Sequence, residues 1–163
     1  MSDQKTTLAN PALKELTPLA GRWDVELRWS PQMHALVGGP AAVQLAARFE
    51  WIEEGSFLVQ YQDSGAGPPQ ARWLIGRDET SPQYTVLYAD ARGVSRVYQM
   101  SLEGRAWKIF RDAPGFSQRF EGRLSPHGAT IDGRWEKSTD GETWEHDFDL
   151  RYTKGRTMAD GIR

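Results

Sequence analysis

The sequence contains no cysteine, which excludes disulfides, thiolate metal sites and a cysteine nucleophile. It also lacks an excess of basic residues, because 20 Lys and Arg stand against 22 Asp and Glu and the net charge is −2. Nucleic-acid-binding proteins concentrate basic residues in a patch or stripe, whereas those of this chain are scattered. We therefore expect no nucleic-acid partner.

The sequence also lacks the features that are typical of membrane and exported proteins. Hydrophobic residues make up 39% of the chain and charged residues 26%, an ordinary balance for a globular protein. Residues 1–9 are polar and hold no apolar run before a cleavage site, which a signal peptide would need. We expect a cytoplasmic protein with no membrane partner, and its 163 residues fit one domain.

Catalytic and metal-binding motifs are also absent. The three histidines have no close spacing that would form a zinc motif, so we predict no metal site. No Gly-x-Ser-x-Gly elbow is present to support hydrolase chemistry. His34 lies near two glycines and His127 precedes Gly128, so both are expected at the surface. The sequence predicts no catalytic residue.

Helical periodicity is confined to the N-terminal segment. Asn10 and Pro11 fit an N-cap and a first helical residue, and leucines recur at helical spacing up to Leu19. This pattern predicts a short helix that covers one end of the domain. The segment Pro31 to Pro40 contains adjacent glycines and predicts a mobile loop.

Strand patterns fill the rest of the chain. Apolar and charged residues alternate without a lapse in the segments Trp23–Trp29 and Trp144–Tyr152, as they do in half-buried strands. Glu-Gly, Asp-Gly and Pro-His-Gly sequences between strands supply the positive-φ residues that tight hairpins need. Strands are predicted at residues 21–29, 43–51, 57–61, 71–77, 83–89, 94–102, 106–111, 117–124, 130–137 and 144–152.

The strand pattern predicts an all-β fold with a single up-and-down antiparallel β-barrel of about ten strands and a short N-terminal helix. Consecutive hairpins leave no room for crossovers, and a sheet with one apolar face closes to remove its edges. We expect the barrel domain to span residues 11–154, between a flexible N-terminus (1–10) and a flexible C-terminal tail (155–163). Barrels of this size leave room for one small ligand.

Candidate ligand-binding residues are those that share the inward rows of the strands. On the last strand His146 has the same parity as Trp144 and Phe148, so both His146 and Trp144 are predicted to face the interior. Tyr61 and Tyr98 are predicted inward on the same reasoning.

Two arginines fall on inward rows. Arg96 shares the row of Tyr98, and Arg111 shares the row of Trp107. If either points inward, its burial without a carboxylate or a ligand anion would be costly, which makes each a candidate anion clamp. The alternative is an arginine at the barrel mouth with its stem on the aromatics and its head in water.

The motif Gly21-Arg22-Trp23 resembles the Gly-x-Trp signature of calycins, the superfamily of lipocalins and fatty-acid-binding proteins. With Glu54-Gly55-Ser56-Phe57-Leu58 and Asp140-Gly141-Glu142-Thr143-Trp144, the pattern from Leu13 to Lys154 resembles a bacterial family of uncharacterised calycin-like barrels, the DUF1579 type. This resemblance implies a calycin-like, lipocalin-like barrel and no established activity.

A related group, the nitrobindin-like haem barrels, holds iron through a histidine on the final strand, and His146 is similar to that position. The resemblance implies haem as an alternative ligand, bound axially by His146. The glycine-rich first strand of the haem group is replaced here by Asp24-Val25-Glu26-Leu27. Apart from this alternative, no cofactor is expected.

Three functional hypotheses remain from the sequence. The chain has seven Trp, five Tyr and six Phe, and aromatic residues often line small-molecule sites. The favoured hypothesis is therefore a barrel that binds an apolar or aromatic small molecule in an aromatic-lined cavity. The first alternative is a cyclase or isomerase acting on a small apolar biosynthetic intermediate, with His146 or a tyrosine moving a proton. The second is a filled barrel whose outer surface mediates self-association, for example as a homodimer.

Overall fold

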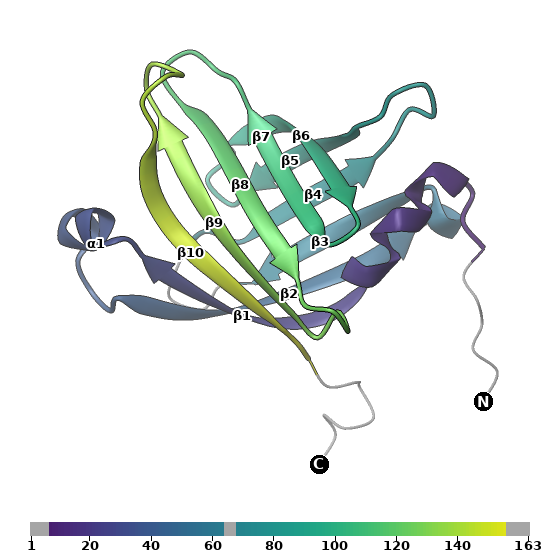
Figure 1. Cartoon of the computed structure of the whole chain (residues 1–163), viewed down its shortest axis with the longest axis horizontal. Helices are drawn as coiled ribbons and strands as arrows, with labels where there is room; N and C mark the ends of the chain where they lie inside the picture. Colours follow the sequence, from purple (N-terminus) through teal and green to yellow (C-terminus); the bar gives the residue numbers. More distant parts are fainter. Residues whose placement is uncertain (1–6, 64–67, 156–163) are drawn as a thin grey trace.

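The computed structural model of this protein describes residues 7–63 and 68–155. Ten antiparallel strands in these residues form a closed barrel, in which each strand pairs with its neighbours in sequence and β10 pairs with β1 (Figure 1). The predicted all-β up-and-down barrel is confirmed. Its strands are β1 (Gly21–Trp29), β2 (Ala42–Ile52), β3 (Phe57–Asp63), β4 (Ala71–Gly76), β5 (Tyr84–Asp90), β6 (Ser95–Glu103), β7 (Ala106–Arg111), β8 (Ser117–Leu124), β9 (Thr130–Ser138) and β10 (Glu145–Lys154).

The predicted flexible ends fall largely on residues 1–6 and 156–163, which lie outside the described residues. The short segment that precedes the barrel is attached to its body. The backbone N–H of Ala9 donates to the carbonyl of Glu54 at 3.2 Å, and the Asn10 side chain donates to the carbonyl of Arg77 at 2.9 Å. Ala9 and Asn10 are thus held against the barrel by hydrogen bonds to two separate connections between strands.

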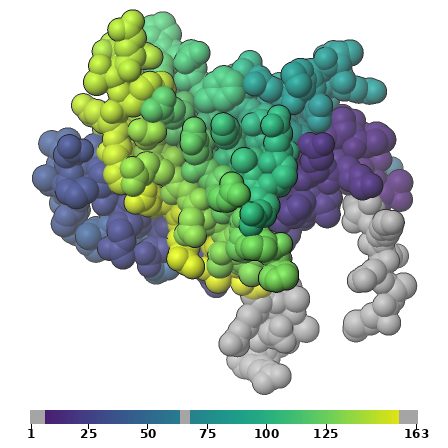
Figure 2. Space-filling view, viewed as in Figure 1, coloured from purple at the N-terminus to yellow at the C-terminus, as the bar shows by residue number. Residues whose placement is uncertain are grey.

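The predicted N-terminal helix is present as a 3₁₀-helix, η1 (Pro11–Leu19), capped by the side chain of Asn10. A 3₁₀-helix has three residues per turn, so a leucine at every third position lies on one face. That face contacts β6 and covers one end of the barrel, as the purple segment does in Figures 1 and 2. The leucines on it are fully buried: Leu13, Leu16 and Leu19.

The mobile loop predicted at residues 31–40 is wrong, because Pro31–Val37 forms an α-helix, α1. The hydroxyl of Ser30 accepts a hydrogen bond from the Met33 N–H at 3.2 Å, and Gly38 ends the helix with a φ of 73°. Serine before proline and a terminal glycine are the signals of a capped helix. Helix α1 lies at the opposite end of the molecule from η1 (Figure 1). A 3₁₀ turn, η2 (Glu53–Gly55), connects β2 and β3.

The inward rows of the strands form one hydrophobic core. Trp23 is 1% exposed and its indole N–H donates to the carbonyl of Leu19 at 2.9 Å, which ties the first strand to η1. Six large residues on the predicted inward rows belong to this core, of which three are buried and three are half-buried at its edge. The buried ones are Trp23, Phe49 and Leu150, and the half-buried ones are Trp29, Trp51 and Phe148.

The Phe120 ring lies over two glycines that pair across β8 and β9. A Cβ atom on Gly122 would lie 2.8 Å from the ring, and one on Gly133 would come closer still. Real Cβ atoms essentially never approach other atoms within 3.0 Å. The second Gly-x-Trp sequence of the chain, which begins at Gly133, therefore has a packing explanation: it makes room for an aromatic ring.

Three exposed apolar residues lie side by side on the outer face. Leu74, Leu87 and Val97 pair directly with one another across β4, β5 and β6, and they are 39%, 46% and 62% exposed. The homodimer that the sequence suggests stays a prediction. The helices in the described residues have at most nine residues, well short of the roughly 20 that a membrane crossing needs, and none is a candidate membrane span.

The turn before β10 is organised by Asp140. Its Oδ1 atom accepts hydrogen bonds from the N–H groups of Glu142 and Thr143, both at 2.8 Å, and from the Ser138 hydroxyl at 3.0 Å. These donors favour the carboxylate form and lower the pKa of Asp140 from its ordinary 3.8 to about 2.

We expect the stabilising effect of Asp140 to depend on pH in a defined direction. Its pKa is lower in the folded protein than in the unfolded chain, so the effect is complete above pH 3.8 and is lost as the pH falls through about 2. An NMR titration of the Glu142 and Thr143 amide signals should follow this midpoint, and the Asp140→Asn variant should lose it. A midpoint near 3.8 in the wild type would contradict the lowered pKa.

Candidate functional site

A cavity of about 170 Å³ lies inside the barrel. It reaches the end opposite η1, where its wall includes Trp29, Pro69, Arg92 and Arg96. Aromatic side chains from most of the strands form much of the wall: Trp29, Trp73, Tyr88, Tyr98, Trp107, Phe120, Trp135, Phe148 and Tyr152. The cavity is therefore an apolar, ring-lined space with one polar end.

The aromatic residues in the middle of the cavity contact one another directly. The ring of Trp73 lies 4.6 Å from that of Tyr88 and 5.2 Å from that of Tyr98, measured between ring centroids. Tyr98 lies 5.9 Å from Trp135. Aromatic pairs at these distances stabilise one another beyond the burial of their surface. The wall is consequently a connected set of rings held in place by its own packing.

Polar groups are placed sparsely among these rings. The Tyr98 hydroxyl donates to Oε1 of Gln118 at 2.6 Å, and Gln118 is 8% exposed. Gln60 is 4% exposed and also lines the cavity, as does Gln62. Sequence reasoning missed all three glutamines, because it chose each inward row by its apolar and aromatic residues. A cavity with few, fixed polar groups can orient a ligand.

The two predicted arginines lie at the polar end beside Tyr98. Arg96 lines the cavity, and its guanidinium lies 5.8 Å from the Tyr88 ring and 5.0 Å from the Phe116 ring. The guanidinium of Arg111 lies 5.9 Å from the Tyr98 ring. In the described part of the chain, neither forms an ion pair with a carboxylate. The structure thus brings three predicted site residues together: Tyr98, Arg96 and Arg111.

A third arginine at this end is neutralised by a carboxylate. Arg92 pairs with Asp90 at 2.8 Å, and the same carboxylate accepts the hydroxyl of Tyr88 at 2.6 Å. The bond from Arg92 holds the pKa of Asp90 well below its usual range. Asp90 therefore stays charged at neutral pH and balances Arg92, whereas Arg96 and Arg111 leave net positive charge beside the cavity.

The tyrosine hydroxyls of the cavity keep their protons at neutral pH. Burial raises the pKa of Tyr98, and the charges of Arg96 and Arg111 oppose this only in part. Burial also raises the pKa of Tyr88 and of Tyr152. Because desolvation disfavours the phenolate, these hydroxyls stay neutral and are poor general bases, and those of Tyr88 and Tyr98 already donate to Asp90 and Gln118.

Tyr61 does not face the cavity, so its predicted inward position is wrong. Its ring lies on the outer face between the guanidinium groups of Arg48 and Arg72, at 4.4 and 4.9 Å. On β3 the alternate residues Gln60 and Gln62 point inward instead. Phe57, Val59 and Tyr61 form the outward row of this strand, and its inward row holds Leu58 and the two glutamines that line the cavity.

The predicted inward positions of His146 and Trp144 are also wrong. A β-bulge lies between His146 and Phe148, and an extra residue on one strand reverses the alternation beyond it. The His146 ring lies 2.9 Å from the Asp149 carboxylate, which also binds Arg134 on the outer face. The Trp144 ring lies 4.1 Å from the Arg119 guanidinium, outside the barrel.

The cavity and its lining do not fit haem. A cavity of about 150 Å³ holds benzene, and pockets for drug-sized ligands run to about 300–1,000 Å³. The volume here, about 170 Å³, suits one small ring and not a porphyrin. None of the three histidines, which all lie in the described residues, lines the cavity. The same residues contain no group of three His, Asp or Glu side chains placed to hold a metal ion.

Comparison with known proteins supports the fold. Rv2717c from M. tuberculosis has a crystal structure that matches this chain with a TM-score of 0.64 at 16% sequence identity, covering 92% of this chain and all of that one. No protein-family model matches the sequence, and no curated protein matches it significantly. At this identity the likeness extends to the barrel fold and not to a ligand or an activity.

Proposed function

We propose that this barrel binds one small, mainly apolar, ring-sized organic molecule in its cavity. The observation that carries the proposal is the cavity of about 170 Å³ with aromatic walls and polar groups at one end. Such a site gains most of its affinity from burial of apolar surface, while a few polar contacts set the orientation.

The polar groups at one end of the cavity would fix the orientation of the ligand. We propose that Arg96, Arg111 and the Tyr98 hydroxyl contact the polar or anionic part of the ligand. Both guanidinium groups lie beside aromatic rings and lack a carboxylate partner among the described residues, so they can donate hydrogen bonds to an acidic oxygen of the ligand. Tyr61, Trp144 and His146 lie outside and are left out of the proposed site.

Binding without chemistry is favoured over turnover. A cyclase or isomerase would need a group inside the cavity that accepts a proton. The raised pKa of Tyr98 keeps its hydroxyl protonated, and His146 lies on the outer face. We also propose kinship with calycin-like barrels of the DUF1579 type, which the Gly21-Arg22-Trp23 motif at the head of β1 supports.

Adjacent alanines on β2 offer a test of the binding site. Ala47 is buried and lines the cavity, whereas its neighbour Ala46 is exposed on the outer face. Replacing Ala47 by Leu fills part of the cavity, so we expect the affinity for a ring-sized probe such as ethylbenzene to fall by about tenfold or more. Isothermal titration calorimetry of the wild type and both variants measures this.

The Ala46→Leu variant is the matched control, because it adds the same three carbon atoms outside the barrel. We expect it to bind the probe like the wild type. The free Ala47→Leu protein should keep its fold, since the added atoms enter existing space. Equal affinity in all three proteins would place binding elsewhere. Native mass spectrometry of the purified wild type, compared with its denatured mass, would detect a retained ligand.

A further inference from the structure

Two indole N–H groups in the cavity wall have no hydrogen-bond partner among the residues that the structure describes. They belong to Trp73, which is 8% exposed, and Trp107, which is 1% exposed. Buried polar groups are almost always hydrogen-bonded, and tryptophan N–H groups usually find a partner when buried. Trp23 follows this rule, because its N–H donates to the Leu19 carbonyl. The two unpaired donors therefore need an explanation.

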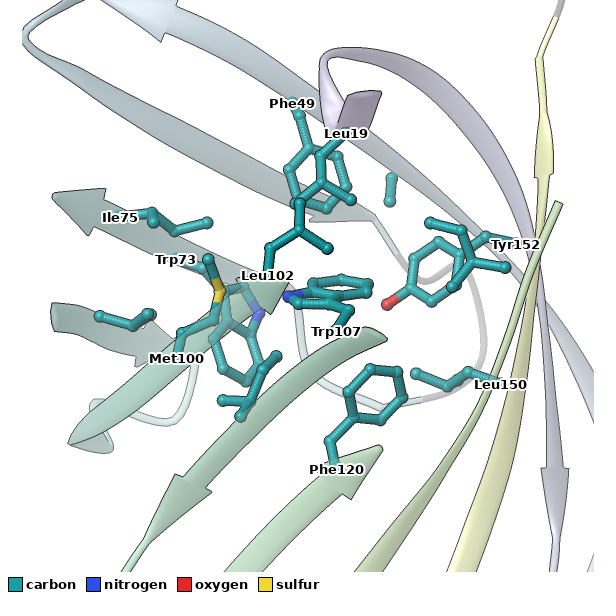
Figure 3. Close-up of a cluster of buried hydrophobic side chains, with 14 of the residues drawn as sticks. Leu19, Phe49, Trp73, Ile75, Met100, Leu102, Trp107, Phe120, Leu150 and Tyr152 are labelled. Carbon is teal, nitrogen blue, oxygen red and sulfur yellow. The ribbon is translucent and has the colours of Figure 1, made fainter. Parts of the chain in front are cut away.

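Both donors lie on the same cavity. Trp73 and Trp107 line it from β4 and β7. In Figure 3 the nitrogen edges of the two indoles are turned toward each other inside the buried cluster, with the Tyr152 hydroxyl directed toward the same group of side chains. Two residues with unpaired donors thus line the space that the proposed function assigns to a ligand.

The polar side chains that line the cavity in the described residues, among them Gln60, Gln62 and Gln118, do not pair with these indoles. Arg96 can only donate, and the Tyr98 hydroxyl already occupies Oε1 of Gln118. A water molecule can accept a bond from an indole in such a place, but a ligand that displaces it loses affinity unless it reproduces the bond. A pure hydrocarbon would leave both donors unpaired.

We propose that the ligand is an aromatic carbonyl compound, whose oxygen accepts hydrogen bonds from the indole N–H groups of Trp73 and Trp107. This inference rests on the proposed function, because it names the chemistry of the molecule that occupies the same cavity. The ring fills the apolar space and the carbonyl oxygen satisfies the two buried donors. A hydrocarbon of equal size would gain the same burial without these bonds.

A matched pair of probes distinguishes the proposed carbonyl ligand from the more general proposal that the cavity binds a ring-sized molecule. Ethylbenzene and acetophenone have nearly the same size and differ by one carbonyl group. A net hydrogen bond changes an affinity by about twofold to tenfold, so acetophenone should bind about tenfold more tightly. In ¹H–¹⁵N NMR spectra, acetophenone should shift the indole signals of Trp73 and Trp107 downfield, while the signal of Trp23 should stay in place.

Variants that keep the ring but remove the donor complete the test. In Trp73→Phe/Trp107→Phe the preference for acetophenone should disappear, whereas Trp144→Phe, outside the barrel, should retain it. Equal affinity of the wild type for both probes, with unshifted indoles, would overturn the inference and leave the proposed function standing. Failure of the wild type to bind either probe would overturn both. The wild-type comparison decides the question even if the double variant does not fold.

Discussion

Replacing Trp23 by Ala is expected to lower the free energy of unfolding by about 3–5 kcal/mol, the usual cost of removing a large buried aromatic side chain. Trp23 is 1% exposed, and its ring meets that of Tyr152 edge-on at 6.2 Å. The substitution removes these contacts and also the hydrogen bond from the Trp23 indole to the Leu19 carbonyl, which holds η1 against β1. Urea denaturation of the wild type and the variant measures the loss.

Trp144→Ala makes the same chemical change on the outer face. The ring of Trp144 contacts the Arg119 guanidinium at 4.1 Å, and an exposed contact of this kind contributes about 0.5–1 kcal/mol. The control variant should therefore lose about 1 kcal/mol or less. If the two variants lost equal stability, Trp23 would not be the core residue that its burial indicates.

Replacing Gly133 by Ala is expected to destabilise the barrel by about 1–3 kcal/mol through overpacking. The added methyl group would enter the space occupied by the Phe120 ring. Because Phe120 also lines the cavity, a ring pushed away from β9 would move into the ligand space. We therefore expect weaker ligand binding together with the lower stability, measured by calorimetry and urea denaturation.

Gly76→Ala is the matched control, because Gly76 also lies in a strand and has no atom within 4 Å of an added Cβ. Its stability should stay within about 1 kcal/mol of the wild type. Combining Gly133→Ala with Phe120→Leu should recover part of the loss, since the smaller side chain gives way to the methyl group. Purely additive losses would show that the ring and the glycine do not interact.

The alternation of residues predicted the barrel and most of its inward rows, because the period of two is a property of each strand alone. It failed at β10. The alternation of Trp144, His146 and Phe148 continues through the bulge without any mark in the sequence. A bulge depends on the partner strand, here β9, and on the hydrogen bond between the Ser30 N–H and the Asp147 carbonyl. The alternation of residues within β10 contains no information about the partner strand or about this hydrogen bond.

The failure at β3 has a different physical cause. Here one row is apolar and the other holds Gln60 and Gln62, and apolar residues were assigned to the interior. The outer row is covered in part by neighbouring side chains, such as the arginines that enclose Tyr61. A cavity that binds a ligand needs some polar groups inside, so the residues that line it can be both buried and polar. The rule that buried residues are apolar fails at such positions.

The residues at the polar end of the cavity were easier to predict than the size of the cavity. Arg96 and Arg111 share their rows with clear aromatic residues, so parity alone places them near Tyr98. The size of the cavity depends on how rings from many strands pack together, and no strand pattern reports it. The unpaired donors of Trp73 and Trp107 depend on the same packing and became visible only in the folded protein.

The seam between β1 and β10 has a consequence for biosynthesis. Trp23 pairs with Lys154, so the two strands that close the barrel are made first and last. Each of the other strand pairs joins neighbours in sequence and can form soon after it leaves the ribosome. One edge of β1 stays unpaired until β10 has been synthesised, and unpaired strand edges are sites of aggregation. We therefore expect nascent chains that stop before β10 to depend on chaperones far more than the finished protein does.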